Sequence, residues 1–508
     1  MFGKMRYFLV TTVILTMVFV SQAAFAAGVK YLFFFVGDGM SIPAIQATEF
    51  YLHDLKSDTP GREPISFTKF PVVGLTSTFD AGRYITDSAS AMTALMSGRK
   101  TVDGVINMDP GKTEKFTTLA EEAKAAGMKI GNLSTVSLDH ATPAGLYAHN
   151  PSRNNYYEIA LELSESGFDY FAGGGFRQPT GKEKDKENIF DILAKKGYTV
   201  IRNRSDFEKL TPPKDKVIVI NPVLDSEAAM PYAIDRSAEQ FALAELVRKG
   251  IELLDNPKGF FMMVEGGKID WACHANDIRS VIGDILDFEQ AVAEAVKFYE
   301  KHPEETLIVV TADHGNGGLS LGYALTGYNL YLELIENQKV SYEVFEGKVK
   351  EYAQNTPKDQ QSLKSFWPTI QENFGFLWLT PEEKSQLEEK VKNGDKEAAK
   401  TLAMVLTEYE MARLEKAFAA SMSEEPPKGD EAKVLYGGYD PLTVTLTHIM
   451  GQKAGISWTT YSHTAEPTAV FALGKHSELF DGWYDNTELY TKMKQALGLG
   501  AAVTQSQY

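Results

Sequence analysis

The sequence predicts an α/β fold: a three-layer αβα sandwich with a mostly parallel central sheet and an inserted helical subdomain. Short, continuously apolar segments alternate with helical patterns along most of the chain, which is typical of parallel strands covered by helices on both faces. By contrast, residues 331–437 are rich in Glu, Lys and Gln and read as helical. The 508 residues are 44% hydrophobic and 23% charged, as in globular proteins of several domains.

The first 26 residues are expected to be a signal peptide. Lys4 and Arg6 precede the apolar run 7–20, and residues 24–26 offer a small-x-small cleavage site. An uncleaved membrane anchor is the alternative, but the run is shorter than the about 20 residues that span a bilayer. We therefore expect cleavage after Ala26, no membrane span afterwards, and a periplasmic or extracellular protein.

Six apolar runs are predicted as strands: residues 30–37, 128–135, 216–220, 259–266, 305–315 and 468–473. Helices are expected between them, at 237–254 and 277–300. Because strands and helices alternate, we expect a mostly parallel sheet in a catalytic domain made of residues 27–330 and 438–508.

The predicted insertion, residues 331–437, has its own helix signals. Thr380 is a predicted N-cap, with Pro381 at the first helical position and Glu383 closing a capping box. Residues 396–421 are expected to form one amphipathic helix, which the segment 423–433 ends.

The net charge of −17 argues against a general nucleic-acid-binding surface. Such a protein can still bind phosphate locally where metal cations dominate one site.

Acids and histidines follow several of the predicted strands. Asp38 follows the first, Glu265 lies at the end of a second and Asp270 follows it, and Asp313 and His314 end a third. An Asp beside Gly is by itself usually a turn residue. In open α/β sheets, however, ligands bind beyond the carboxyl ends of strands, so these side chains can converge.

The segment GKIDWACHAND indicates a metal site. Asp270 and His274 are four residues apart and share a face if the segment is helical. A carboxylate and an imidazole are natural zinc ligands, and His463 is a candidate third ligand. A solvated Asp–His pair is the alternative.

The segment ITDSASAMTALMSGRK, residues 85–100, permits two interpretations. Asp87, Ser88 and Ser90 can simply cap a helix. One of them can instead be a nucleophile at a helix end, where anions are favoured.

Six motifs in register resemble the alkaline phosphatase family of exported bacterial, metal-dependent phosphomonoesterases. They are VGDGM, TDSASAMTALMSGRKT, DHATPAGLYAHNPSR, VEGGKIDWACHAND, TADHG and WTTYSHT. The resemblance covers roughly residues 28–325 and 438–475 and leaves the helical insertion uncovered. It implies hydrolysis of phosphate monoesters to alcohol and phosphate.

By this resemblance, Ser88 is the nucleophile that becomes phosphoserine, and Arg153 binds the phosphate oxygens. The resemblance also implies two Zn²⁺ and one Mg²⁺. The matched ligands are Asp270, His274 and His463 for one zinc; Asp38, Asp313, His314 and the Ser88 oxygen for the second; and Asp38, Thr142 and Glu265 for the magnesium. Family members are commonly homodimers, so a dimer is expected.

Two residues near the expected phosphate site depart from the best-known enterobacterial pattern. His140 stands in place of an aspartate and Trp271 in place of a lysine. Loss of the lysine charge is expected to weaken phosphate binding. An imidazole beside Thr142 is a further candidate metal ligand and would favour zinc or cobalt over magnesium at the third site.

Two alternatives stay open. A dimetal phosphodiesterase or sulfatase could use the same scaffold, although DSASAM does not fit the sulfatase modification motif. An exported metal- or phosphate-binding protein without turnover would not need a hydroxyl at Ser88.

Overall fold

The computed structural model describes residues 28–57, 59–214, 216–425 and 427–500. The predicted signal peptide, residues 1–26, lies outside the described residues. Within the described part of the chain, none of the helices is long and apolar enough to cross a membrane.

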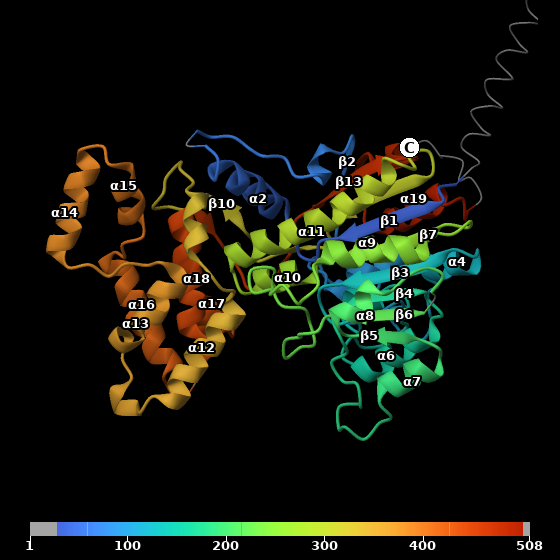
Figure 1. Ribbon diagram of the computed structural model, residues 1–508, viewed down its shortest axis with the longest axis horizontal. Coiled ribbons are helices and arrows are strands. Elements are labelled where there is room, and N and C mark those ends of the chain that lie inside the picture. Colours follow the sequence, from blue (N-terminus) through green and yellow to red (C-terminus); the bar gives the residue numbers. More distant parts are fainter. Residues whose placement is uncertain (1–27, 58, 215, 426, 501–508) are drawn as a thin grey trace, which may run out of the picture.

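A ten-stranded sheet forms the centre of the protein (Figure 1). Its strands, in spatial order, are β14 (Gly482–Asp485), β2 (Val72–Ser77), β13 (Thr468–Gly474), β8 (Thr306–Thr311), β1 (Tyr31–Val36), β7 (Phe260–Glu265), β3 (Lys129–Ser134), β4 (Tyr170–Gly173), β6 (Val217–Ile220) and β5 (Thr199–Ile201). Strand β13 runs antiparallel to β2 and β8, and the other neighbouring strands are parallel. The mostly parallel sheet is confirmed.

Two hydrophobic cores cover the two faces of this sheet. In β1, Phe33 and Phe35 belong to one core, while Leu32, Phe34 and Val36 belong to the other. Successive side chains of a strand point to opposite faces, so the fully apolar strand serves both cores. This is the αβα sandwich that the apolar runs predicted.

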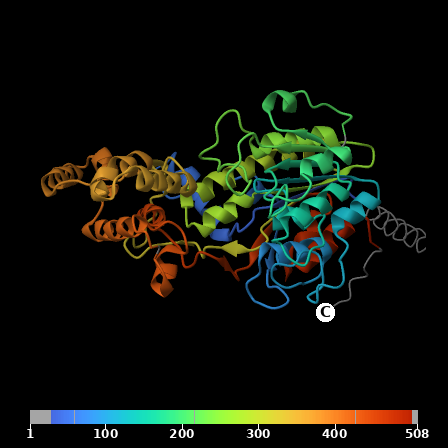
Figure 2. The ribbon, with the colours of Figure 1, turned by 90° about the horizontal axis from the view of Figure 1, so that it is seen from below.

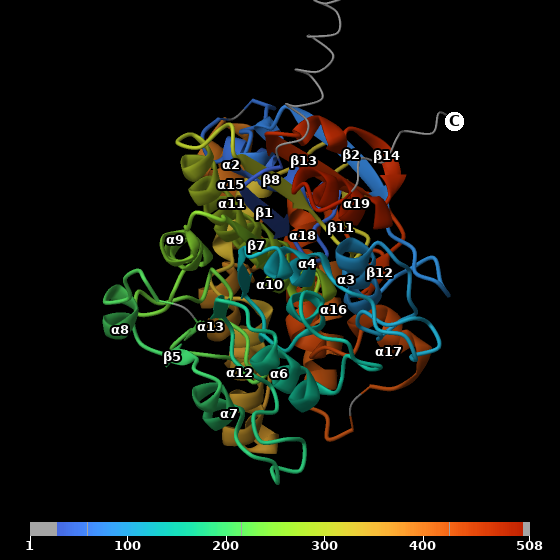
Figure 3. The ribbon, with the colours of Figure 1, turned by 90° about the vertical axis from the view of Figure 1, so that its right-hand side faces the viewer.

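Helices lie on both sides of the sheet (Figures 1 and 3). The first core includes residues of α2 (Ile42–Asp54), α9 (Leu243–Leu254), α10 (Gly267–His274) and α11 (Ile278–Tyr299). The second includes residues of α3 (Ser88–Ser97), α4 (Leu119–Ala125), α5 (Ala141–Ala144), α6 (Tyr156–Glu165), α7 (Ile189–Lys195) and α19 (Thr487–Ala496). The short helix α8 (Arg204–Glu208) follows β5.

Several helices extend away from one end of the sheet (Figures 1 and 2). We call residues 342–436 the helical arm. It comprises α12 (Tyr342–Asn355), α13 (Leu363–Phe374), α14 (Pro381–Lys392), α15 (Lys396–Ala403), α16 (Glu408–Ser421) and α17 (Gly429–Tyr436), and α18 (Pro441–Ala454) leads back to the sheet. Phe345 and Phe366 of the arm belong to the first core, so its interior is continuous with the main body.

Short elements complete the chain. The two-residue strands are β9 (Gly315–Asn316), β10 (Ser320–Leu321), β11 (Ile456–Ser457) and β12 (His463–Thr464); 3-10 turns lie at Phe67–Lys69, Leu332–Asn337, Lys358–Gln360 and Ser477–Phe480. Strand β12 pairs with β9 in an antiparallel bridge, with His463 opposite Asn316.

Some predicted boundaries were wrong. The run 305–315 leaves the sheet after Thr311, because the polar ADHG segment forms a loop. The helix expected at 396–421 is two helices, because the chain turns at residues 404–407 and Thr407 starts a new capping box with Glu410. The helix expected from 237 begins at Leu243. The capping box of Thr380 and Glu383 is confirmed.

Candidate functional site

Three neighbouring strand ends bring the acidic residues together. Val36, the last residue of β1, is in register with Glu265 of β7 on one side and with Thr311 of β8 on the other. Asp38 and Asp313 each follow two residues beyond their strand. The parallel register therefore places all three carboxylates at one edge of the sheet, as the sequence predicted.

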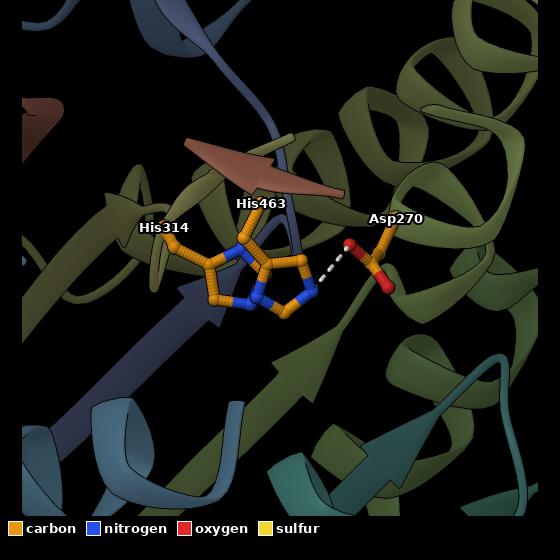
Figure 4. Close-up of side chains that lie close together, drawn as sticks. All are labelled: Asp270, His314 and His463. Carbon is orange, nitrogen blue, oxygen red and sulfur yellow. Dashed lines mark ion pairs between the residues drawn. The ribbon is translucent and has the colours of Figure 1, made fainter. Parts of the chain in front are cut away.

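A first cluster joins α10 to β12. Asp270 Oδ2 lies 3.3 Å from His274 Nε2, so the four-residue spacing does place them on one face of a helix. His463 Nε2 lies 3.2 Å from His274 Nε2. The same His463 Nε2 lies 3.7 Å from Asp270 Oδ1 (Figure 4). Asn316 anchors the carboxylate, because its Nδ2 donates to Asp270 Oδ1 at 2.6 Å.

The histidines of this cluster present lone pairs to each other. His274 Nδ1 lies 2.7 Å from the Tyr461 carbonyl oxygen, and His463 Nδ1 lies 2.8 Å from that of Thr86. A carbonyl oxygen only accepts, so both Nδ1 atoms are donors and both Nε2 atoms of the neutral rings carry lone pairs. Two lone pairs 3.2 Å apart repel each other unless a proton or a metal ion lies between them.

A second cluster is formed by Asp38, Asp313 and His314, which are buried. His314 Nε2 lies 3.3 Å from Asp38 Oδ1 and 3.3 Å from Asp313 Oδ2. The ring of His314 stacks on that of His463, with centroids 3.6 Å apart (Figure 4), so the first and second clusters adjoin. The Ser88 hydroxyl reaches the same His314 Nε2 at 3.3 Å.

A third cluster contains Asp38, His140 and Glu265, whose ligand atoms lie within 4.8 Å of one another. Thr142 Oγ1 donates to Asp38 Oδ2 at 3.1 Å. Ser134 Oγ makes a short hydrogen bond to Glu265 Oε2. The structure thus places His140 in this cluster, beside the expected Thr142.

The clusters concentrate negative charge away from water. Burial, together with neighbouring carboxylates, raises the pKa of Asp38 and of Glu265 well above their usual values and that of Asp313 to about 8. Buried oxygens of these three residues lack a hydrogen-bond partner within the described residues. Bound cations would compensate for both features.

The donor atoms suit particular metals. Mixed imidazole and carboxylate ligands in the first and second clusters are those that zinc prefers. The oxygens of Asp38, Glu265 and Thr142 suit magnesium, whereas an imidazole from His140 suits zinc or cobalt.

The phosphate-binding candidates lie beside Ser88. Asp87 caps α3, since its Oδ1 accepts from the Ser90 backbone N–H at 3.0 Å. Arg153 Nη1 donates to Asp87 Oδ2 at 2.8 Å, and Arg153 Nη2 lies 3.3 Å from His140 Nε2. The two interpretations of this segment are therefore compatible: Asp87 caps the helix, and Ser88 faces the metal-binding cluster.

Trp271 forms an edge-to-face contact with His140, with centroids 5.9 Å apart. The ammonium of Lys268 lies 4.7 Å from the centre of the Trp271 ring. Lys268 is buried and pairs with Asp225 at 2.8 Å and with Glu343 of the helical arm at 3.1 Å.

Sequence reasoning did not identify Asn316, Lys268 or Tyr461. Asn316 stands two residues after His314, so the position of a polar side chain in that loop could have indicated it. The contribution of Tyr461 is a backbone carbonyl, which leaves no signal in the residue type.

Comparison with known proteins shows the family of this chain. The family model described as alkaline phosphatase matches residues 29–499. Alkaline phosphatase 3 of Bacillus subtilis (strain 168) is 30% identical over 478 residues, which cover 92% of this chain and 89% of the relative.

Solved structures share the fold. The cold-active alkaline phosphatase of a psychrophilic Shewanella sp. has a TM-score of 0.72 at 29% identity, covering 92% of this chain and 99% of that one. A histidine-to-glutamate variant of the TAB5 alkaline phosphatase with Mg bound in its M3 site has a TM-score of 0.60 at 23% identity, covering 93% and 98%.

Proposed function

This chain belongs to the alkaline phosphatase family, and from that premise we propose that it hydrolyses phosphate monoesters through a covalent phosphoserine at Ser88. The observation that carries the proposal is the contact between the Ser88 hydroxyl and His314 Nε2, at 3.3 Å, inside a buried cluster of candidate metal ligands. A hydroxyl in that position can attack phosphorus as soon as its proton is removed.

We assign two zinc ions and one further metal to this site. Asp270, His274 and His463 would hold the first zinc, and Asp38, Asp313 and His314 the second. Asp38, Thr142 and Glu265 would hold the third ion, magnesium, or zinc or cobalt if His140 also binds. When bound, these cations lower the pKa of the nucleophile and stabilise the charge on the leaving oxygen.

The residues of the chain then act in two steps. The Ser88 oxygen forms a bond to phosphorus as the ester bond breaks, and the alcohol leaves with a proton. Water next attacks the phosphoserine, which releases phosphate and restores the hydroxyl. The N-terminus of α3 favours negative charge beside Ser88. Arg153, held by Asp87, presents a planar guanidinium to the phosphate oxygens.

His140 and Arg153 are coupled in this proposal. A neutral imidazole has one lone pair. If His140 accepts a hydrogen bond from Arg153, it has no lone pair for a metal, so metal binding by His140 would release Arg153 to the phosphate.

Two expectations complete the proposal. The N-terminal sequence pattern supports export, to the periplasm or the extracellular space, after cleavage at Ala26. A homodimer is proposed by analogy with the family, and sedimentation of the purified protein tests it.

The deciding experiment compares rates on a phosphate monoester, a phosphate diester and a sulfate ester, with protein supplied with zinc and magnesium. We expect the monoester to be hydrolysed fastest. A faster diester or sulfate ester would favour the related hydrolases instead.

A radiolabelled monoester, quenched in acid, tests the intermediate. We expect labelled protein from the wild type and from Ser97→Ala, at the far end of the same helix, and none from Ser88→Ala. Label that persists in Ser88→Ala would contradict the assignment of the nucleophile. A wild type without turnover, together with a Ser88→Ala variant that binds phosphate with unchanged affinity, would indicate a binding protein.

A further inference from the structure

Tyr461 links the helical arm to the first metal-binding cluster. This tyrosine stands two residues before His463, and its backbone carbonyl accepts the hydrogen bond from His274 Nδ1 at 2.7 Å. The carbonyl therefore fixes both the orientation and the tautomer of His274, and it leaves Nε2 as the atom that faces the cluster.

The side chain of Tyr461 belongs to the arm instead. Its hydroxyl donates to the Leu435 carbonyl, in the last turn of α17, at 2.6 Å. Its ring packs against a small hydrophobic cluster formed by Ala417 of α16, Tyr436 of α17 and Val444 of α18. The backbone of Tyr461 therefore contacts the metal-site residue His274, while its side chain contacts the arm.

Gly437 shows how closely the arm and this ring fit. A Cβ atom added at Gly437 would lie 2.2 Å from the Tyr461 ring. The φ of Gly437 is +62°, a left-handed conformation that ends α17 and that glycine adopts without strain. A larger residue there would have to displace either the ring or the end of the arm.

His448 of α18 also packs against the Tyr461 ring. Its imidazole stacks on Tyr461 with centroids 5.7 Å apart, and its Nε2 lies 2.9 Å from Asn276 Oδ1. Asn276 in turn donates from Nδ2 to the carbonyls of Cys273 and Thr460, at 2.8 and 3.1 Å. These bonds join the end of α10 to Thr460, the residue before Tyr461, and so help to fix the Tyr461 backbone.

We propose that Tyr461 is a positioning residue through which the helical arm orients His274 and thereby sets the affinity of the first cluster for its metal ion. This inference rests on the proposed metal centre and extends it to a part of the chain outside the six sequence motifs. In the second cluster, His314 Nδ1 instead faces the carbonyl of the adjacent Gly315, at 3.3 Å, which lies outside the arm.

The test measures zinc affinity of metal-stripped full-length protein by competition with a chelator. Tyr461→Ala keeps the carbonyl but removes the ring, and Gly437→Ala pushes against the ring. Tyr409→Ala, an exposed tyrosine on α16 of the same arm, is the matched control. We expect one zinc equivalent to weaken about tenfold in Tyr461→Ala and Gly437→Ala, as for other changes behind a metal ligand. The remaining equivalents and Tyr409→Ala should match the wild type.

The melting temperature of the metal-free variants separates positioning from general stability. If Tyr461→Ala and Gly437→Ala melt earlier but bind every zinc equivalent like Tyr409→Ala, the proposal is overturned. Equal weakening of all equivalents also overturns it, because that result means general loosening of the site. A wild type that takes up no zinc would overturn the metal assignment itself, together with this inference.

Discussion

Arg153 donates to Asp87 at 2.8 Å, and the same Asp87 carboxylate caps the helix that begins at Ser88. One side chain therefore fixes both the candidate nucleophile and the candidate phosphate-binding guanidinium. Burial by itself would raise the pKa of Asp87, but the Arg153 charge and the hydrogen bonds from Ser90 outweigh it and lower this pKa to about 2. The carboxylate of Asp87 is consequently ionised at neutral and alkaline pH.

The first prediction concerns this carboxylate. Asp87→Ala should raise both KM and the inhibition constant for phosphate about tenfold, because Arg153 loses the partner that orients it. A tenfold change corresponds to about 1.4 kcal/mol, within the usual range for a hydrogen bond to a charged group. Steady-state kinetics with phosphate as inhibitor measure both constants. Asp395→Ala is the control, since Asp395 caps α15 without contacting an arginine. It should lower stability by about 1 kcal/mol and leave KM unchanged. Equal KM values in both variants would refute the role of Asp87.

The second prediction concerns metal removal and pH. In metal-free protein, burial and the Asp270 charge raise the pKa of Asp313 to about 8, far above its value of 3.8 in the unfolded chain. Between pH 6.5 and 8 the folded state then holds more protons than the unfolded state, so stability falls as pH rises. Burial lowers the pKa of His314 to about 4 and that of His463 to about 3. The contributions of these two histidines to the free energy of unfolding therefore vary with pH mainly below pH 6.5.

Thermal melts of chelated protein should therefore show a melting temperature that declines from pH 6.5 to 8. Asp313→Asn should make this decline shallower, and zinc-loaded wild type should show a flatter curve, because bound cations replace the protons. A metal-free melting temperature that rises across this window would contradict the proposed burial of unpaired carboxylates.

The third prediction concerns the third cluster. His140→Asp combined with Trp271→Lys replaces an imidazole with a hard oxygen ligand and adds a cation. We expect more bound magnesium per chain and stronger activation by magnesium than in the wild type. Metal analysis and a magnesium titration of the rate check this. Unchanged metal content together with an unchanged magnesium response would show that His140 does not influence this site.

The fourth prediction concerns the buried ammonium beneath Trp271. Lys268→Met leaves the Asp225 carboxylate, whose side chain is 8% exposed, without its cationic partner, which should cost about 3 kcal/mol of unfolding free energy. Denaturant unfolding measures it, and Lys268→Met with Asp225→Asn should recover part of the loss. The surface pair of Lys350 and Glu346 on α12 provides the control, where Lys350→Met should change stability by less than about 1 kcal/mol. Equal effects of the two lysine changes would exclude a special role for Lys268.

The apolar runs predicted six of the sheet strands, β1, β3, β6, β7, β8 and β13, and missed β2, β4, β5 and β14. Strands β1, β7 and β8 are buried on both faces, so nearly every residue is apolar and the run stands out. Strand β2 was missed because it alternates between buried and partly exposed positions. Strand β5 has only three residues, and β14 exposes Trp483. Such short strands are defined by their neighbours rather than by their own composition.

The sequence by itself indicated several candidate metal ligands, because part of the relevant spacing is local. Asp270 and His274 share a face of any helix they form, and an acid directly after an apolar strand lies at the edge of a sheet. Only the tertiary structure decided that His463 meets His274 at 3.2 Å and that Tyr461 ties this pair to the helical arm. Those contacts join residues far apart in the chain through backbone carbonyls and ring packing. Neither depends on a recognisable residue pattern, so they exist only once the sheet and the arm have packed together.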